Sequence, residues 1–392
     1  MKTKRYINPN EYGSLLYNYK ERSAVSKVLK STRIFRYSTS KYPFVRQFEK
    51  QVENKFKVNY CLGVINGTAG LVTALKGIGI KTGDKVLISG FTYISTALAV
   101  ILCGGIPIPM ELDLSSGIDK NDLLHEIQKG ECKAVIVTHL QGRCFNLARL
   151  HALLKENNIF LIEDACQGFG SQCDGVFAGT FGDVGVYSFQ QFKQISCGEG
   201  GAVVTNNEKI YNTMRNYSDM GSVRDHFPNW NDSTCLVGEN YRMTNISGAI
   251  LFEQMKKFDR MVKSQHLKRR YIMQALQDRV TSIISSQCPD GDTAMNILLT
   301  INNPNDFSNI KMLAKEKYNI EARKMWSGMY FENELFRKQK LTDIDLKKHE
   351  CTKTKMIINK LIVLSIPPKL SYKNANKIID FIIELKQLKY ID

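Results

Sequence analysis

The segment 179–205 reads "GTFGDVGVYSFQQFKQISCGEGGAVVT" and holds a single lysine, Lys193. Lys193 follows an aromatic-rich run, "YSFQQF", and precedes a glycine-rich turn, "CGEGG". Most lysines are solvated surface groups, so a surface side chain is the ordinary interpretation. A lysine held between a strand-like run and a glycine turn can instead serve as a nucleophile. The rest of the chain decides between these two interpretations.

The region around this segment alternates short apolar runs with amphipathic stretches, from about residue 60 to residue 205. Runs such as "AVIVTH" are β-branched and uninterrupted, which is typical of strands buried on both faces. Stretches such as "TAGLVTALKGIGI" and "NLARLHALLKENN" have the pattern of helices. The alternation predicts an α/β fold with a mainly parallel sheet covered by helices. Parallel strands place their functional loops at their carboxyl ends, so we expect the functional residues there.

A second domain is expected because 392 residues exceed what one hydrophobic core usually supports. The stretch "NISGAILFEQMKKFDRMVKSQHLKRRYIMQAL", which begins at Asn245, is predicted to form one long amphipathic helix, with Leu251 and Met255 at helical spacing. The later runs "TAMNILLTI" and "KLIVLSIP" favour a smaller α+β domain that closes over the first. We predict a large domain at residues 1–250 and a small domain at residues 251–392.

The composition is that of an ordinary soluble globular protein, with 43% apolar and 23% charged residues. No apolar run reaches the ~18 residues that a membrane span needs. The first residues lack the apolar core of a secretion signal. These features predict a cytoplasmic protein with no membrane partner. The ten cysteines form no CxxC pair and have no histidine cluster nearby, so we expect no metal site. Several of them fall inside apolar strand-like runs, which favours buried, reduced thiols.

The net charge of +16 is compatible with a polyanionic partner such as nucleic acid. The basic residues are spread along the chain, however, and no basic stripe interleaved with aromatic residues is present. A small substrate that carries phosphate fits this charge at least as well. We therefore expect no nucleic-acid partner.

The motif "LIEDACQGFGS" places Glu163 and Asp164 at the end of an apolar strand, with Gln167 three residues further on. An acidic residue at the end of a buried strand is costly unless it has a partner. The alternative is a cap for a following helix, because aspartate is a favoured N-cap residue. This motif alone leaves both interpretations open.

Two further strand ends carry candidate residues. In "INGTAGLVTAL", Gly67 and Thr68 lie between a strand and a helix, where exposed backbone N–H groups can bind an anion. A simple turn with a capping residue is the alternative. In "SGFTYISTALAV", Phe91 and Tyr93 follow another strand. Such an aromatic side chain can pack in the core or stack on a flat heterocycle.

Together these features meet the requirements of a pyridoxal 5′-phosphate (PLP) pocket. The cofactor aldehyde needs a lysine amine, which Lys193 supplies. The pyridine nitrogen needs a carboxylate to stay protonated, so that the ring can withdraw electrons. The phosphate needs hydroxyl groups and backbone donors, and the ring needs an aromatic cover. The combination favours a catalytic Lys193 over a surface lysine.

The chain resembles the DegT/DnrJ/EryC1/StrS family of sugar aminotransferases from about residue 35 to the C-terminus. The pieces "NGTAGLVTALKGIGIKTGDKVL", "IEDACQGFGS", "GENYRMTNISGAIL" and "LSIPPKLS" occur in family order. The opening segment is the most specific of them, with its lysine five residues after Ser188 and "GEGG" following. This resemblance implies the aspartate-aminotransferase fold (PLP fold type I), with a seven-stranded sheet.

The resemblance also implies the catalytic roles. Lys193 would link covalently to PLP and later carry a proton between the Cα and C4′ carbons. Asp164 would pair with the ring nitrogen. Relatives that dehydrate keto-sugars carry histidine at the position of Lys193, so lysine here favours transamination. A non-catalytic binding or regulatory protein on the same scaffold is the alternative of another class, and it would not need Lys193 and Asp164.

The remaining cofactor contacts are implied in the same way. Gln167 would lie near the ring hydroxyl, and Tyr93 would stack on the ring. Ser188 would hold the phosphate together with the turn at Gly67 and Thr68. Asn240 would reach the phosphate from a neighbouring subunit, which implies a homodimer with shared active sites.

The implied reaction transfers an amino group from glutamate or glutamine to a keto-sugar, of which a nucleotide-linked keto-deoxysugar is the first choice. A keto-cyclitol or an eight-carbon keto-sugar acid is the alternative acceptor. Relatives that act on nucleotide-linked 4-keto-sugars carry a Trp–x–Pro–Met–His run. Here Trp326 and Met329 are kept, while Gly328 and Tyr330 replace proline and histidine. The acceptor therefore stays open.

Overall fold

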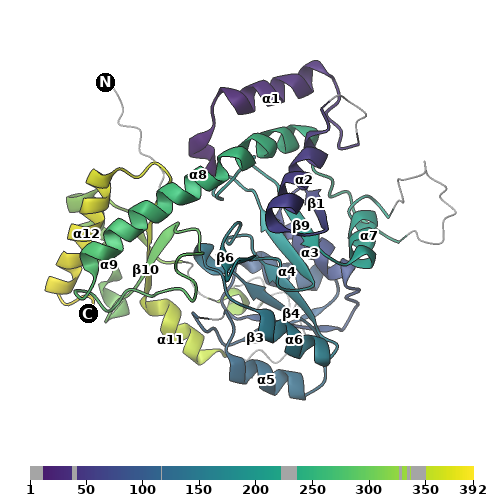
Figure 1. The fold of residues 1–392 in the computed structure, drawn as a ribbon. Helices are drawn as coiled ribbons and strands as arrows, with labels where there is room; N and C mark the ends of the chain where they lie inside the picture. The colour runs from purple at the N-terminus through teal and green to yellow at the C-terminus, as the bar shows by residue number, and fades with distance from the viewer. Residues whose placement is uncertain are drawn as a thin grey trace.

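The computed structural model describes residues 12–37, 42–115, 117–221, 236–325, 329–332, 336 and 350–392. These residues form a seven-stranded sheet, a separate three-stranded sheet and a two-stranded ribbon, together with the helices that cover them (Figure 1). The long helix α8 passes from the region of the large sheet to that of the small one (Figure 1). The positions of the functional residues depend on how the two larger sheets and their helices pack together.

The large sheet has the strand order β1-β9-β8-β5-β4-β2-β3. Strand β9 is antiparallel to both of its neighbours, and the other six strands run in one direction. The prediction of a mainly parallel sheet of seven strands is confirmed. Its strands are β1 (Tyr60–Val64), β2 (Lys85–Ser89), β3 (Ile106–Met110), β4 (Cys132–Thr138), β5 (Phe160–Asp164), β8 (Val184–Ser188) and β9 (Gly201–Thr205).

Helices cover both faces of this sheet. One face packs against α3 (Gly67–Gly77), α4 (Ile94–Leu102) and α7 (Glu208–Tyr217). The other face packs against α2 (Phe44–Phe56), α5 (Lys120–Gln128), α6 (Ala148–Glu156) and the first half of α8. Both faces are therefore buried, as the uninterrupted apolar runs predict.

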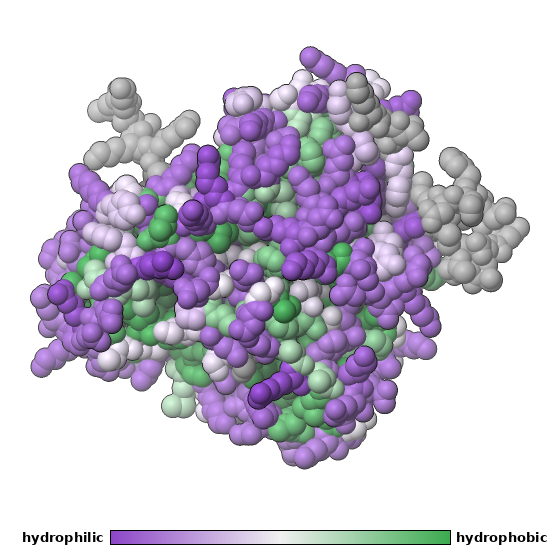
Figure 2. All heavy atoms as spheres, viewed as in Figure 1, coloured by the Kyte–Doolittle hydropathy of each residue, from purple (hydrophilic) through white to green (hydrophobic). Residues whose placement is uncertain are grey.

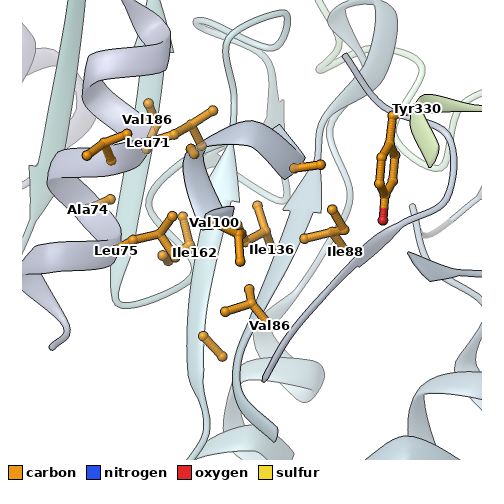
Figure 3. Close-up of a cluster of buried hydrophobic side chains, with 14 of the residues drawn as sticks. Leu71, Ala74, Leu75, Val86, Ile88, Val100, Ile136, Ile162, Val186 and Tyr330 are labelled. Atoms are coloured by element: carbon orange, nitrogen blue, oxygen red, sulfur yellow. The ribbon is translucent and has the colours of Figure 1, made fainter. Parts of the chain in front are cut away.

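The strand residues alternate between the two cores. In β2, Val86 and Ile88 belong to the core under α3 and α4, whereas Leu87 belongs to the opposite one. Figure 3 shows Leu71 and Leu75 of α3 beside such side chains of the sheet. Burying one aliphatic side chain of this size stabilises the fold by about 1.5–3 kcal/mol. These contacts fix the strand order and hold the carboxyl ends of the strands together.

Helix α8 (Asn245–Leu276) has the bounds that the sequence predicts. Thr244 caps its start, because the Thr244 hydroxyl accepts a hydrogen bond from the Ser247 N–H at 3.2 Å. The first half packs against α1 (Tyr19–Lys30) and α2, and the second half packs against α12 (Tyr372–Gln387). One continuous helix thus joins two hydrophobic cores.

The small sheet has the order β10-β12-β11, and its strands are antiparallel. They are β10 (Asn296–Thr300), β11 (Ala322–Arg323) and β12 (Leu361–Ser365), with α9 (Phe307–Leu313), α11 (Thr352–Lys360) and α12 alongside. A third core joins this sheet to α12 and the end of α8. The domain boundary at residue 250 stays a prediction, because α8 runs unbroken across that position.

Most of the described cysteines are thiols, and Cys61, Cys103, Cys144 and Cys351 are buried as expected. The pair formed by Cys173 and Cys288 is different, since these residues form a disulfide with their Cα atoms 5.4 Å apart. Neither residue lies in an apolar strand-like run, so the prediction of reduced thiols does not extend to this pair. The chain brings them together because the β6 ribbon strand (Gln172–Cys173) lies against the segment after α8, where the Gln172 N–H donates to the Gly291 carbonyl.

Hydrophilic residues cover most of the molecular face in Figure 2, with smaller hydrophobic areas among them. Within the part of the chain that the structure describes, no helix combines the length and the apolar character of a membrane span.

Candidate active site

A cavity of about 560 Å³ opens at the carboxyl edge of the large sheet. Four of its lining segments lie at or just beyond the carboxyl ends of parallel strands: 66–68 at β1, Tyr93 at β2, 164–167 at β5 and 188–193 at β8. The shared direction of these strands brings their carboxyl ends to one edge. Residues far apart in the sequence thus meet in one place.

Seven of the eight predicted site residues line this cavity, and the eighth does not. The seven are Gly67, Thr68, Tyr93, Asp164, Gln167, Ser188 and Lys193. Asn240 is exposed and forms an isolated β-bridge with Asp219, away from the cavity of its own chain. Its predicted contact with the cofactor of a neighbouring subunit stays a prediction.

Lys193 follows β8 in a turn that its backbone holds in place. The Lys193 N–H donates to the Gln190 carbonyl at 3.0 Å, and the Lys193 carbonyl accepts from the Gly13 N–H at 3.0 Å. Burial lowers the pKa of the Lys193 amine, while Cys166 and Asp164 act in the opposite direction. A lowered pKa leaves more neutral amine near pH 7, and only the neutral amine is nucleophilic.

Asp164 ends β5 and is buried, with 3% of its surface exposed. Its Oδ2 accepts from the Thr96 hydroxyl at 2.8 Å, and its Oδ1 accepts from the Cys166 N–H at 3.1 Å. The residues that follow form turns rather than a helix, so the helix-cap interpretation of Asp164 is wrong. No described basic side chain lies within 4 Å of this carboxylate. The site therefore holds an oriented acidic group that can accept one more donor.

The start of α3 forms an anion cradle beside Ser188. Asn66 caps the helix by accepting from the Ala69 N–H at 2.8 Å, and the N–H groups of Gly67 and Thr68 have no acceptor among the described residues. A Cβ atom on Gly67 would lie 3.0 Å from both Cys166 Sγ and Ser188 Cβ. Glycine therefore keeps open the space between the helix start and the end of β8. A phosphate group suits this space, because backbone N–H groups at a helix start attract anions.

Tyr93 and Gln167 complete the predicted set. Tyr93 precedes α4 and is 53% exposed, whereas Phe91 is buried in the core. Gln167 is held by two neighbours, since its Oε1 accepts from the Gln141 N–H at 3.1 Å and its carbonyl accepts from the Gln194 side chain at 3.2 Å. Tyr93 can therefore cover a ring from the open side, with Gln167 fixed at the edge.

Several residues of the site were not predicted from the sequence. Thr96, which orients Asp164, lies in the first turn of α4, the helix that follows β2, where a hydroxyl group is not part of any recognisable sequence motif. Tyr12 and Arg323 line the cavity from the N-terminal segment and the small sheet. Both belong to segments without a local motif, so only the folded chain reveals them.

Of the Trp–x–Pro–Met–His position, the two described residues, Met329 and Tyr330, do not line the cavity. Tyr330 is buried in the core, with 4% of its surface exposed (Figure 3). Met329 is buried beside it. Trp326 and Gly328 lie outside the described residues.

The sequence profile of the DegT/DnrJ/EryC1/StrS aminotransferase family matches residues 17–383. The chain belongs to this family. The resemblance drawn from the motifs is therefore confirmed, and so is the prediction of an enzyme that transfers amino groups.

Two curated relatives of this aminotransferase have names that refer to different compounds. The GDP-perosamine synthase of Escherichia coli O157:H7 is 33% identical over 266 residues, which cover 68% of this chain and 70% of that protein. The L-glutamine:2-deoxy-scyllo-inosose aminotransferase of Streptomyces kanamyceticus is 30% identical over 221 residues, which cover 55% of this chain and 52% of that protein.

Solved structures agree with the fold. The aminotransferase from Psychrobacter cryohalolentis has a TM-score of 0.82 at 22% identity, covering 95% of this chain and 98% of that one. NtdA from Bacillus subtilis, solved with bound cofactor PMP, has a TM-score of 0.79 at 19% identity. The match covers 94% of this chain and 82% of that one. The predicted fold and the dependence of this aminotransferase on PLP are confirmed.

Proposed function

We propose that this aminotransferase moves an amino group from glutamate or glutamine to the carbonyl of a keto-sugar, with a nucleotide-linked keto-deoxysugar as first choice. The curated relatives that act on sugars and cyclitols support this class of acceptor. One observation carries the proposal. The Lys193 amine and the buried Asp164 carboxylate line the same cavity as the anion cradle of Gly67, Thr68 and Ser188.

The residues of this cavity fit the cofactor. Gly67, Thr68 and Ser188 would hold its phosphate, Asp164 its ring nitrogen and Lys193 its aldehyde, with Tyr93 and Gln167 at the ring. When bound, PLP supplies a carbonyl that accepts the amino group and a ring that withdraws electrons. The chain supplies orientation, since Thr96 and the Cys166 N–H hold the two oxygens of Asp164.

Lys193 has two proposed tasks. As a neutral amine it forms the covalent attachment, which its lowered pKa favours. Once a substrate amine displaces it, the Lys193 Nζ carries the proton that must move during amino transfer. Cys166 does not compete for that proton, because burial raises the pKa of its thiol well above the usual value. Lys193 is therefore the general base of the proposed reaction.

The proposed reaction is tested by following its two halves separately. Adding glutamate or glutamine to the PLP-loaded protein is expected to convert the visible absorption to that of the amine form. A panel of keto-sugars is then added, and the acceptor is the compound that restores the original spectrum. Nucleotide-linked keto-sugars, keto-cyclitols and eight-carbon keto-sugar acids form the three arms of the panel. If no amino acid converts the cofactor, the proposed reaction is wrong.

Arg323 is the residue that we propose for the carboxylate of the amino donor. It lies at the end of β11, next to the cavity, and it is the only guanidinium among the described lining residues. Its buried Nε has no hydrogen-bond partner in the described part of the chain. The buried Tyr12 hydroxyl lies beside it, since Arg323 and Ser365 both counteract the rise that burial causes in the Tyr12 pKa. A guanidinium beside a catalytic cavity, with a buried Nε that no described group satisfies, suits a carboxylate.

Replacing Arg323 by glutamine is expected to lower kcat/KM for the donor by about 10–100-fold. This range corresponds to the ~1.5–3 kcal/mol of one charge-assisted hydrogen bond. The kcat/KM for the acceptor should change much less. Lys324→Gln is the matched control, because the neighbouring Lys324 ammonium lies over the Phe307 ring, 5.2 Å from its centroid. An unchanged donor kcat/KM in Arg323→Gln would remove Arg323 from the donor site.

The oligomeric state and the cellular location of this aminotransferase are further proposals. We propose a homodimer in which Asn240 reaches the cofactor phosphate of the partner, since Asn240 is exposed and remote from its own cavity. A monomeric mass in sedimentation equilibrium would contradict it. We also propose a cytoplasmic location, which cell fractionation tests.

A further inference from the structure

A second cavity, of about 230 Å³, lies beside the active-site cavity. It is bounded by the second half of α8, the segment that follows α8, and β10. Gln141 lines both cavities, and its Oε1 accepts from the Asn296 side chain at 2.7 Å. The volume is many times the roughly 10–15 Å³ that one water molecule needs. There is therefore room for a small ligand between the two sheets.

The charges that line this second cavity are unequal. Three arginines, Arg143, Arg269 and Arg270, face two carboxylates, Asp290 and Asp292. Arg269 forms an ion pair with Asp292. Arg270 lies 3.7 Å from Asp290, and both of these side chains are largely exposed. Arg143 is the arginine of this lining with no carboxylate within 4 Å in the described chain, although Asp292 and Asp113 act on it from further away.

Asp292, the buried carboxylate of the lining, is hydrogen-bonded to groups other than Arg143. Besides its ion pair, its Oδ2 accepts from the Ser286 hydroxyl at 2.9 Å and its Oδ1 accepts from the Ala294 N–H at 2.9 Å. Both carboxylates of the lining thus form their ion pairs with Arg269 and Arg270, and neither forms one with Arg143.

Arg143 is buried, with only 5% of its surface exposed. Its Nη2 donates to the Ser285 carbonyl, the one acceptor that the described residues give its side chain. No carboxylate of the described chain lies within 4 Å of it. Burial lowers the pKa of Arg143, but a guanidinium stays protonated in proteins. A buried charge without a direct ion pair is costly, which points to an anion as the missing partner.

We propose that this cavity binds a small oxyanion, a carboxylate or a phosphate, on the guanidinium of Arg143. The planar fork of a guanidinium matches two oxygens of either group. His266 also lines the cavity; burial lowers its pKa, and the ring is hydrogen-bonded to the Asp292 backbone. The bound anion would join the loop that carries Gln141 to strand β10. This site is independent of the proposed acceptor and of the cofactor phosphate cradle.

The test uses the PLP-loaded protein, in which the phosphate cradle of the active site is filled. Thermal unfolding is measured in inorganic phosphate, in acetate and in sodium chloride at equal ionic strength. We expect a saturable rise in Tm with at least one oxyanion above the chloride baseline, because a ligand that binds only the folded state stabilises it. Comparing phosphate with acetate identifies the preferred group. No rise above chloride with either anion overturns the proposal.

Two variants and one control assign the effect to this cavity. Arg143→Gln is expected to lose the saturable rise, whereas Arg149→Gln should keep it, because Arg149 is exposed on α6. Met273→Trp fills the cavity from α8 and leaves Arg143 in place, so it should also lose the rise. If Arg143→Gln does not fold by circular dichroism, Met273→Trp decides the question. A rise that persists in the folded variants contradicts the site.

Discussion

Replacing Lys193 by alanine is expected to abolish amino transfer and the visible absorption of the lysine-linked cofactor. The loss of turnover should reach at least about a thousandfold, because both the covalent attachment and the proton transfer depend on the same amine. The fold should survive, since the Lys193 backbone keeps its hydrogen bonds to Gln190 and Gly13. Absorption spectra and single-turnover rates of both half-reactions measure the effect.

The matched control for this variant is Lys209→Ala. Lys209 is exposed on α7, away from the active-site cavity, so its removal changes the net charge by the same amount. Spectrum and turnover should be those of the wild type. If Lys193→Ala kept the absorption band together with turnover, Lys193 would not be the attachment site.

Replacing Asp164 by asparagine is expected to have the second largest effect, a loss of about 10²–10³-fold in the rates of both half-reactions. Removing one preorganised electrostatic partner from a buried site has effects of this size. Asparagine keeps the shape and the contact with Thr96, but it lacks the charge that would keep the cofactor ring nitrogen protonated. Single-turnover rates with glutamate, and the absorption maximum of the bound cofactor, measure the change.

Thr96→Val separates the effect of the Asp164 charge from the effect of the Asp164 orientation. It leaves the Asp164 carboxylate charged and removes one hydrogen bond of 2.8 Å, so we expect a loss of about tenfold or less. Thr96→Ser should restore most of the rate. Turnover of Asp164→Asn within a few-fold of the wild type would show that this carboxylate does not assist the ring.

The catalytic candidates could be predicted from the sequence because each one belongs to a local motif. Lys193 and Ser188 lie in one glycine-bounded segment, and Asp164 ends an apolar strand. Strand direction then accounts for their meeting, since parallel strands present their carboxyl ends at one edge. The long helix α8 was also predictable, because its apolar periodicity is sustained over 32 residues.

The sequence by itself determined the sheet, the family and the strand-end residues, because apolar periodicity and the chemistry of strand ends are local properties. Only the tertiary structure decided which remote groups join them. It brought Arg323 and Tyr12 to the cavity, left Arg143 buried without a carboxylate, and joined Cys173 to Cys288 across 115 residues. Burial and charge balance depend on contacts between distant segments, and these contacts exist only once the chain has folded.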